Sequence, residues 1–275
     1  MKKSLPRKSA IYSLLFFCSC SWADEGIAYY MANEGVMVSH GDTKIAFDPI
    51  FRNGFGQYLL LPAEMESALF AGEPPFDGLD AVFISHYHGD HFSAEDLLRL
   101  MEAHPQLQLF APAQAVLEIR AVNDVANIMN RVNQVALEYQ DAPVSLGIDG
   151  IDVEAVRIPH SGWPDSRAEV ENIAWRVTLD EAATVLHLGD ADARDVHFAI
   201  DAEFWQRNQP DTAFPPYWFF GSRAGREILQ NRIGADSNVG VHVPVTIPAD
   251  PVQRPQELRS ADLFTRPTET RSIGH

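Results

Sequence analysis

The stretch Phe83-Ile84-Ser85-His86-Tyr87-His88-Gly89-Asp90-His91-Phe92 decides the fold that we expect for this chain. It places three imidazoles and one carboxylate within six residues, directly after an apolar run that is typical of a strand. In an extended strand, side chains two residues apart project to the same side, so His86 and His88 can face one metal ion. The glycine that follows allows a sharp turn, after which Asp90 and His91 can point towards a second ion.

A helix is expected directly after this cluster. Ser93 is the predicted N-cap, with Asp96 three residues later, and His104-Pro105 ends the apolar stripe. The cluster therefore lies on a strand-to-helix loop. Histidines spaced by two and three residues beside an aspartate are what a dinuclear site of nitrogen and oxygen ligands needs. The alternative is a polar surface loop whose histidines bind nothing.

The pattern H-x-H-x-D-H at residues 86–91 resembles the motif of the metallo-β-lactamase-fold superfamily of metal-dependent hydrolases. The segment D-x-A-F-x-P-Y-W at residues 211–218 and the residues around His242 resemble one branch of it, which includes ascorbate-phosphate lactonases and the phospholipase D acting on N-acyl phosphatidylethanolamine. The resemblance implies an α/β protein, a four-layer αββα sandwich with its site at one edge between the sheets.

The same resemblance implies a set of seven metal ligands. The set assigns one ion to His86, His88 and His160, a second ion to Asp90, His91 and His242, and places Asp190 between them as a bridge. Ligands that are all nitrogen or oxygen, with several imidazoles, suit two zinc ions and leave manganese or iron open. Asp48 precedes a proline, and two interpretations stay open for it: support of the site from behind, or a simple turn.

Two cations that share a water lower its pKa towards about 7, which yields a hydroxide nucleophile without a separate base. Asp90 is the candidate catalytic residue, because its carboxylate can orient that nucleophile. Such a site cleaves an ester, lactone, amide or phosphodiester, and a small molecule or a lipid is the expected substrate. The alternatives are a metal-dependent oxidoreductase resembling an iron dioxygenase on the same fold, and a non-catalytic periplasmic binding protein. At position 88, members with a di-iron centre usually carry a carboxylate, so His88 favours hydrolysis.

Residues 1–23 have the pattern of a signal peptide, with a basic start, an apolar core and a small-x-small end at Ser21-Trp22-Ala23. We expect cleavage after Ala23 and a periplasmic or secreted protein without a transmembrane segment; lipidation of Cys20 is the alternative. Cleavage removes four basic and no acidic residues, which takes the formal net charge from −17 to −21. So acidic a chain disfavours nucleic acid as a partner. The sequence predicts no oligomeric state.

The mature chain is expected to be one hydrolase domain, residues 24–253, followed by a polar and peripheral tail, residues 254–275. Its first three strands form a predicted antiparallel meander, in which Asn33-Glu34 is one of the separating turns. A helix over residues 193–205 and a last strand over residues 238–244, carrying His242, are expected further on.

Two aromatic segments, residues 51–58 and 217–220, are the predicted walls of the substrate pocket, with Arg52, Asn53 and Arg223 as polar groups. The alternative is that Trp218 belongs to the core. The remaining histidines receive no role: His187 is interpreted as a strand histidine, and the others as solvated side chains, namely His40, His104, His197 and His275.

Overall fold

The structure, a computed structural model, describes residues 26–123 and 126–273. The expected signal peptide, its cleavage after Ala23, the lipidation of Cys20 and the terminal His275 all lie outside the described residues. Within the described part of the chain, no helix is long and apolar enough to cross a bilayer.

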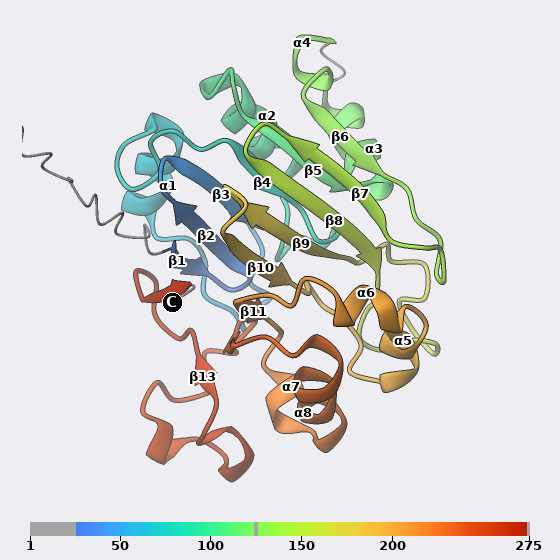
Figure 1. Cartoon of the computed structure of the whole chain (residues 1–275). Coiled ribbons are helices and arrows are strands. Elements are labelled where there is room, and N and C mark those ends of the chain that lie inside the picture. The colour runs from blue at the N-terminus through green and yellow to red at the C-terminus, as the bar shows by residue number, and fades with distance from the viewer. Residues whose placement is uncertain (1–25, 124–125, 274–275) are drawn as a thin grey trace, which may run out of the picture.

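The strands of the described residues form two seven-stranded sheets (Figure 1). The first sheet has the order β14-β1-β2-β3-β4-β5-β6, with strands Gly26–Ala32 (β1), Gly35–His40 (β2), Thr43–Phe47 (β3), Ala81–Phe83 (β4), Gln108–Pro112 (β5), Val132–Val135 (β6) and Thr270–Ile273 (β14). The second has the order β13-β12-β11-β10-β9-β8-β7, with strands Val144–Ile148 (β7), Ile151–Arg157 (β8), Ile173–Leu179 (β9), Ala183–His187 (β10), Thr212–Phe214 (β11), Ser237–Gly240 (β12) and Asp262–Leu263 (β13).

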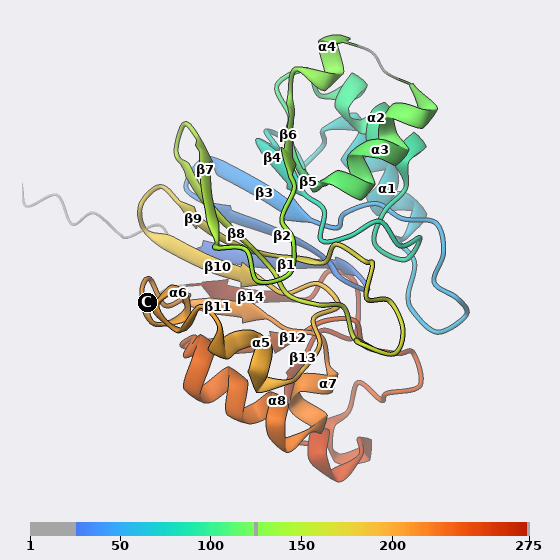
Figure 2. The same cartoon turned by 90° about the vertical axis from the view of Figure 1, so that its right-hand side faces the viewer.

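Helices cover the outer face of each sheet, so the molecule has four layers (Figure 2). The first sheet is covered by α1 (Ala63–Ala71), α2 (Ala94–Ala103), α3 (Ala113–Val122) and α4 (Ala126–Met129). The second is covered by α5 (Asp195–Ala199), α6 (Ala202–Gln206), α7 (Trp218–Gly221), α8 (Arg223–Ile228) and the π-helical turn η1 (Leu229–Ile233). This arrangement confirms the expected αββα sandwich.

Alternation along the strands explains the layering, because successive side chains of a strand point to opposite faces of the sheet. In β2, Val36 and Val38 enter the core between the two sheets, while Met37 packs under the helices. Both faces of these strands are therefore apolar, as a sheet covered on both sides requires. The predicted meander is confirmed, since β1, β2 and β3 pair antiparallel.

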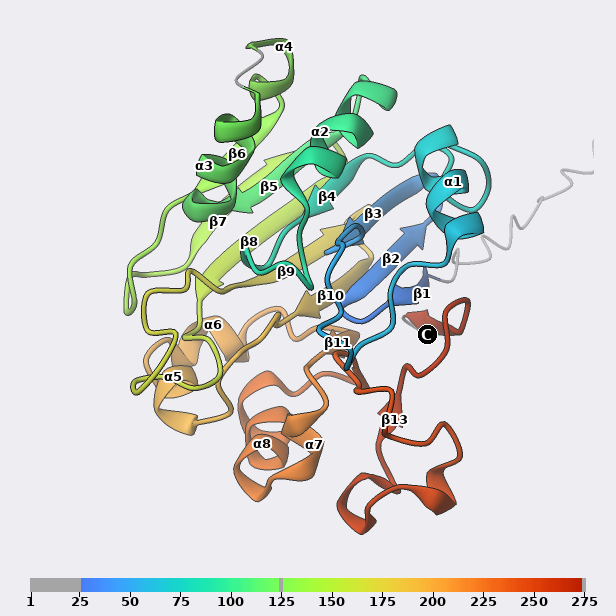
Figure 3. The same ribbon diagram turned by 180° about the vertical axis from the view of Figure 1, so that it is seen from behind.

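The prediction of a peripheral C-terminal tail is wrong. Strand β14 pairs with β1 at the edge of the first sheet, β13 pairs with β12, and two short turns, η2 (Pro251–Gln253) and η3 (Gln256–Leu258), precede them (Figure 3). Phe264 is fully buried and stacks on Tyr30, with ring centroids 4.9 Å apart. The segment is polar because it supplies edge strands, in which alternate side chains face solvent. Its few apolar side chains complete the core.

Two element boundaries also differ from the sequence prediction. The single helix expected over residues 193–205 is two short helices, α5 and α6. The strand expected over residues 238–244 ends at Gly240, so His242 lies in the loop that follows, and two further strands come after it. The backbone of His242 has φ +54°, a left-handed conformation that no strand accommodates.

Candidate metal centre

The motif loop leaves β4 at the edge where the two sheets meet, and the opposite sheet fixes its position. The indole Nε1 of Trp175, on β9, donates to the carbonyl of Ile84 at 3.0 Å. The backbone N–H of Ile173 donates to the carbonyl of Ser85 at 2.9 Å. A buried tryptophan of one sheet thus holds the end of a strand of the other, directly before the histidine cluster. The ends of β8, β10 and β12 deliver the remaining site residues to the same edge.

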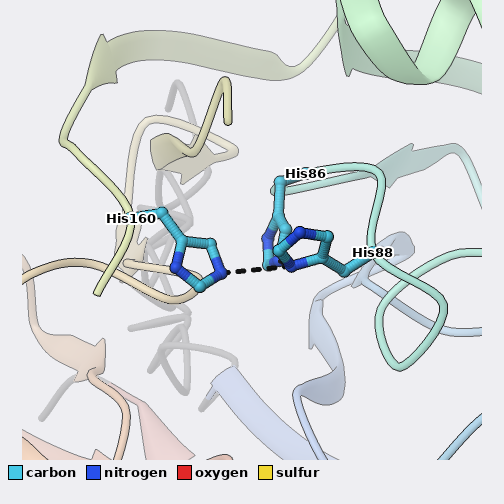
Figure 4. A group of neighbouring side chains, drawn as sticks. All are labelled: His86, His88 and His160. Atoms are coloured by element: carbon cyan, nitrogen blue, oxygen red, sulfur yellow. Dashed lines mark hydrogen bonds between the residues drawn. The ribbon is translucent and has the colours of Figure 1, made fainter. Parts of the chain in front are cut away.

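His86, His88 and His160 form the first group, with their ring nitrogens turned towards one another (Figure 4). The Nδ1 atom of His88 lies 3.0 Å from Nε2 of His86 and 3.2 Å from Nε2 of His160. Nitrogens bound to one tetrahedral zinc at about 2.0–2.1 Å are separated by about 3.3 Å, so the spacing fits a shared ion. The Nδ1–H of His160 donates to the carbonyl of Ser161 at 2.8 Å, which leaves its Nε2 lone pair free to face the other two rings.

Asp90, His91 and His242 form the second group. The Nε2 atom of His242 lies 3.3 Å from Oδ2 of Asp90, and Nε2 of His91 lies 3.8 Å from the same oxygen. Nε2 of both histidines is buried without a hydrogen-bond partner. Buried polar atoms without partners are rare and need an explanation, and a cation at the point where they converge provides one.

Asp190 lies between the two groups and contacts both. Its Oδ2 is 3.1 Å from Nε2 of His160 in the first group, and its Oδ1 is 3.1 Å from Nε2 of His242 and 3.5 Å from Nε2 of His91 in the second. One carboxylate oxygen per group is the arrangement that a bridging ligand requires.

The turn that carries Asp190 depends on Gly189. This glycine has φ +54°, and a Cβ atom there would lie 2.4 Å from Oδ1 of Asn172 and 2.6 Å from Cβ of Ser85. Asn172 accepts from the N–H of Asp190 at 2.9 Å and donates to the carbonyls of Ile158 and Leu188. The side chain of Asn172 therefore fixes the Asp190 backbone and ties it to the end of β8.

Asp48 supports the site from behind, which decides between the two interpretations left open for it. Its side chain is fully buried and accepts from the N–H of Ser85 at 2.7 Å and from the Ser85 hydroxyl at 2.6 Å. Its Oδ2 lies 2.9 Å from Nδ1 of His91. A proton on that Nδ1 orients the ring and directs the Nε2 lone pair at the site, the usual role of a carboxylate behind a metal-ligating histidine.

The electrostatics differ between the two groups. Burial and the adjacent imidazole of His160 lower the pKa of His88 to about 4, and burial lowers the pKa of His86, so these two rings are neutral with free lone pairs. Burial alone would lower the pKa of His242 as well, but the carboxylates of Asp190 and Asp90 outweigh it and raise that pKa to about 9. The second group therefore favours a positive charge, which a metal ion supplies in place of a proton.

A cavity of about 520 Å³ opens over the site. Its walls contain four aromatic side chains, Phe55, Tyr58, Tyr217 and Trp218. Both predicted aromatic segments thus contribute to the cavity, although not with every residue, since Phe51 and Phe219 are buried in the core. Trp218 is only partly buried and donates from Nε1 to the carbonyl of Ala191 at 3.0 Å.

The prediction that Arg52 and Arg223 serve the pocket is wrong. Arg52 donates to Asp96 and Glu66 and ties its loop to α2 and α1, and the Arg223 side chain is 87 % exposed beside Glu227. The positive residue on the wall is Arg167. Among the described residues no carboxylate lies within salt-bridge distance of it, and its Nη1 donates to the carbonyl of Ser161 at 3.5 Å.

Several polar residues that the sequence left without a role are buried. Asn33 and Glu34, interpreted as a surface turn, are fully buried beneath the site. His197 is 2 % exposed, and its Nδ1 lies 2.8 Å from the hydroxyl of Tyr139, so it is not a solvated helix histidine. His187 is fully buried on β10, as expected for a strand histidine, but it faces Glu34. An acidic residue between two apolar strands was the one signal that could have revealed Glu34.

The model of the beta-lactamase superfamily domain matches residues 43–220, more than half of the chain. The chain belongs to this superfamily. The structure of this chain is also similar to solved structures with this fold. One is the metallo-β-lactamase-fold protein YhfI from Bacillus subtilis, which has 18 % sequence identity to this chain and a TM-score of 0.58, over 90 % of this chain and 99 % of YhfI. Together with the His/Asp cluster, the family identifies an enzyme of the metal-dependent hydrolase kind.

Two other solved structures share the superfamily fold. Igni18, a metallo-hydrolase from Ignicoccus hospitalis, has 16 % identity and a TM-score of 0.59, over 91 % of this chain and 99 % of that one. An isothiocyanate hydrolase from Delia radicum gut bacteria has 13 % identity and a TM-score of 0.60, over 90 % and 98 %. At these identities the likeness is one of fold alone. No curated protein matches the sequence.

Proposed function

We propose that the protein is a dinuclear zinc hydrolase that cleaves an ester, lactone or phosphodiester bond of a small molecule or lipid. The observation that carries this proposal is the position of Asp190, with one carboxylate oxygen at each of the two ligand groups. In this proposal His86, His88 and His160 hold the first ion, Asp90, His91 and His242 hold the second, and Asp190 contacts both. Nitrogen and oxygen donors suit zinc, and manganese and iron accept the same donors.

Two divalent ions held at this site supply Lewis acidity and lower the pKa of water towards about 7. The residues of the chain add orientation to this chemistry. Asp90 lies on the cavity wall, so its carboxylate would accept a hydrogen bond from the attacking water and orient it. The walls around it combine four aromatic side chains with polar ones, so a substrate can pack on apolar surface while polar groups orient it.

Tyr58 is the candidate hydrogen-bond donor to the substrate. Its ring meets His242 edge-on, with centroids 4.0 Å apart, and its side chain lines the cavity. Burial and the carboxylate of Asp190 raise the pKa of Tyr58, so its hydroxyl stays protonated at neutral pH. A protonated hydroxyl at this place donates to the oxygen on which negative charge develops during cleavage.

Elemental analysis of protein loaded with saturating zinc tests the dinuclear proposal. We expect two ions per chain, and one ion per chain in natively folded protein would overturn it. Asp190→Ala should remove most of the activity, because both ions lose a shared ligand. A screen with lactones, phosphodiesters and β-lactams identifies the bond class, since the fold by itself does not select a substrate. Oxygen uptake by iron-loaded protein in place of hydrolysis would favour an oxidoreductase.

We also propose that the enzyme is exported after removal of residues 1–23. The basic start, apolar core and small-x-small end of this segment support the proposal. Mass spectrometry of the native protein should find a chain that begins at Asp24. An intact Met1 on cytoplasmic protein would overturn the proposal, and a lipid on Cys20 would change it to a membrane-anchored form.

A further inference from the structure

Glu34 is a buried carboxylate beneath the second ligand group that neither the motif nor the ligand set includes. It lies in the tight turn between β1 and β2 and is fully buried. The same turn contacts the site through its backbone and through Asn33, whose Nδ2 donates to the carbonyl of Asp90 at 2.8 Å and whose carbonyl accepts from the N–H of His242 at 3.0 Å. The turn is therefore part of the site's floor.

The carboxylate of Glu34 has no hydrogen-bond partner among the described residues. The Nε2 atom of His187 lies 3.0 Å from both the carbonyl oxygen and Oε2 of Glu34, but its N–H is directed at the carbonyl. The N–H of Gly189 donates to Nδ1 of His187 at 3.3 Å, which assigns a ring proton to Nε2. Stacking on Phe47, with centroids 4.8 Å apart, fixes the ring in this position.

A buried carboxylate whose oxygens accept no hydrogen bond is costly, so it either holds a proton or faces a cation. A carboxylate oxygen of Glu34 lies within 4.8 Å of ligand atoms of Asp190 and His242, and, in another group, of Asp48 and His91. Glu34 therefore faces the second ligand group from below. Its distance from the imidazole nitrogens of that group exceeds the 4.0 Å of a direct ion pair, so it supports the group and does not complete it.

The site contains an excess of carboxylates over positively charged side chains. Four carboxylates, Glu34, Asp48, Asp90 and Asp190, are all less than 9 % exposed, and among the described residues no lysine or arginine lies within 4.0 Å of any of them. Asp190 contacts both ligand groups, whereas Asp48, Asp90 and Glu34 lie at the second group only. Most of the carboxylate therefore lies on the second side.

We infer that Glu34 is a positioning carboxylate of the second metal site, which raises the affinity of that site for divalent ions. Because Glu34 acts as a nearby negative charge and not as a ligand, it should strengthen the binding of Zn²⁺ and Mn²⁺ alike. This inference rests on the proposed dinuclear function. It concerns metal affinity, so its test is separate from the identity of the substrate.

The test is Glu34→Gln, which keeps the shape of the side chain and removes its charge. Stepwise Zn²⁺ and Mn²⁺ affinities of full-length protein stripped of metal are measured by calorimetry with a competing chelator. We expect the second ion, whether Zn²⁺ or Mn²⁺, to bind about 10- to 100-fold more weakly, the range found for supporting residues of metal ligands, and the first ion to bind as in the wild type. Glu34→Asp, which withdraws the carboxylate by one methylene, should give a smaller loss of the same kind.

Glu154→Gln is the matched control, because Glu154 is also a shielded carboxylate but pairs with Arg176 and Arg207 away from the site, at 2.6 and 2.8 Å. It should lower the melting temperature and leave both metal affinities at the wild-type level. If Glu34→Gln binds both ions as tightly as the wild type does, the inference is overturned and the dinuclear proposal stays intact. That result would mean that Glu34 carries no charge in the wild type, because an amide then replaces it without effect. A wild-type protein that binds one ion would overturn both.

Discussion

Arg167→Ala is the substitution that most directly tests which substrates the cavity selects. Among the described residues that line the cavity, Arg167 is the one arginine or lysine. It lies in the loop that begins at His160, a candidate metal ligand. Its backbone has φ +61°, and the turn is held by a hydrogen bond from Val170 N–H to the Arg167 carbonyl at 3.2 Å. Because the side chain lacks a carboxylate partner, we expect it to bind a negatively charged group of the substrate at a distance from the scissile bond.

The expected magnitude follows from the exposure of the side chain. A hydrogen bond to a charged group contributes about 1.5–3 kcal/mol, and solvent screening reduces an exposed pair to about 1 kcal/mol. The variant should therefore lose roughly fivefold in kcat/KM for an anionic substrate. Loss on an uncharged substrate of the same shape should be within experimental error, and the effect on the anionic one should shrink as salt is added.

The assay compares two p-nitrophenyl esters of equal chain length, one ending in a methyl group and one in a carboxylate. Arg223→Ala is the control, because it also removes an exposed arginine but one that pairs with Glu227 outside the cavity. Equal losses on both esters in Arg167→Ala, or the same selective loss in Arg223→Ala, would refute the reasoning. Metal content is measured in each variant, so that damage to the site is recognised.

Three further predictions concern stability and the pocket. Chelation of the metals should lower the melting temperature by roughly 20 °C, since each of the two proposed ions at about a thousand times its Kd stabilises by about 4 kcal/mol; calorimetry that finds no shift would contradict the metal site. Arg52→Ala should destabilise by at most about 1 kcal/mol at pH 7 without altering substrate preference. A hydrogen bond from Arg52 lowers the pKa of Asp96 in the folded protein. The stabilisation is therefore present above the unfolded pKa of about 3.9 and is lost as the pH falls through the pKa of Asp96 in the folded protein. A difference in denaturation midpoint between wild type and variant that persists at low pH would contradict this. Trp218→Phe removes the hydrogen bond to Ala191 at a cost of about 1 kcal/mol and should change relative kcat/KM among substrates, whereas an equal loss for all of them would assign Trp218 to the core.

The sequence predicted the fold well because its strongest signals are local. The motif at residues 86–91 concentrates chemistry that few loops carry, and the strand before it and the helix after it have their own patterns. The N-cap is an example, since Ser93 does accept from the N–H of Asp96, at 3.4 Å. The expected layers and the first meander are confirmed for the same reason.

The sequence was less informative where a residue's role depends on a distant partner. Arg52 and Arg223 had the right charge and lay near the aromatic segments, but their carboxylate partners on α1, α2 and α8 occupy them. Arg167 lies outside both aromatic segments that were the predicted pocket walls, residues 51–58 and 217–220, so the sequence did not connect it with the pocket. The C-terminal segment was polar on average, although single residues such as Phe264 fill the core.

The sequence by itself determined the family, the layered architecture and the identities of the ligand-type side chains, because a strand, a turn and a short motif are encoded within a few residues. Only the tertiary structure decided how these side chains combine: Asp190 between the two groups, Asp48 behind His91, and Glu34 beneath the second group. These contacts join residues that are tens to more than a hundred positions apart. Burial, charge pairing and the orientation of a lone pair are properties of the folded surroundings, and no local pattern encodes them.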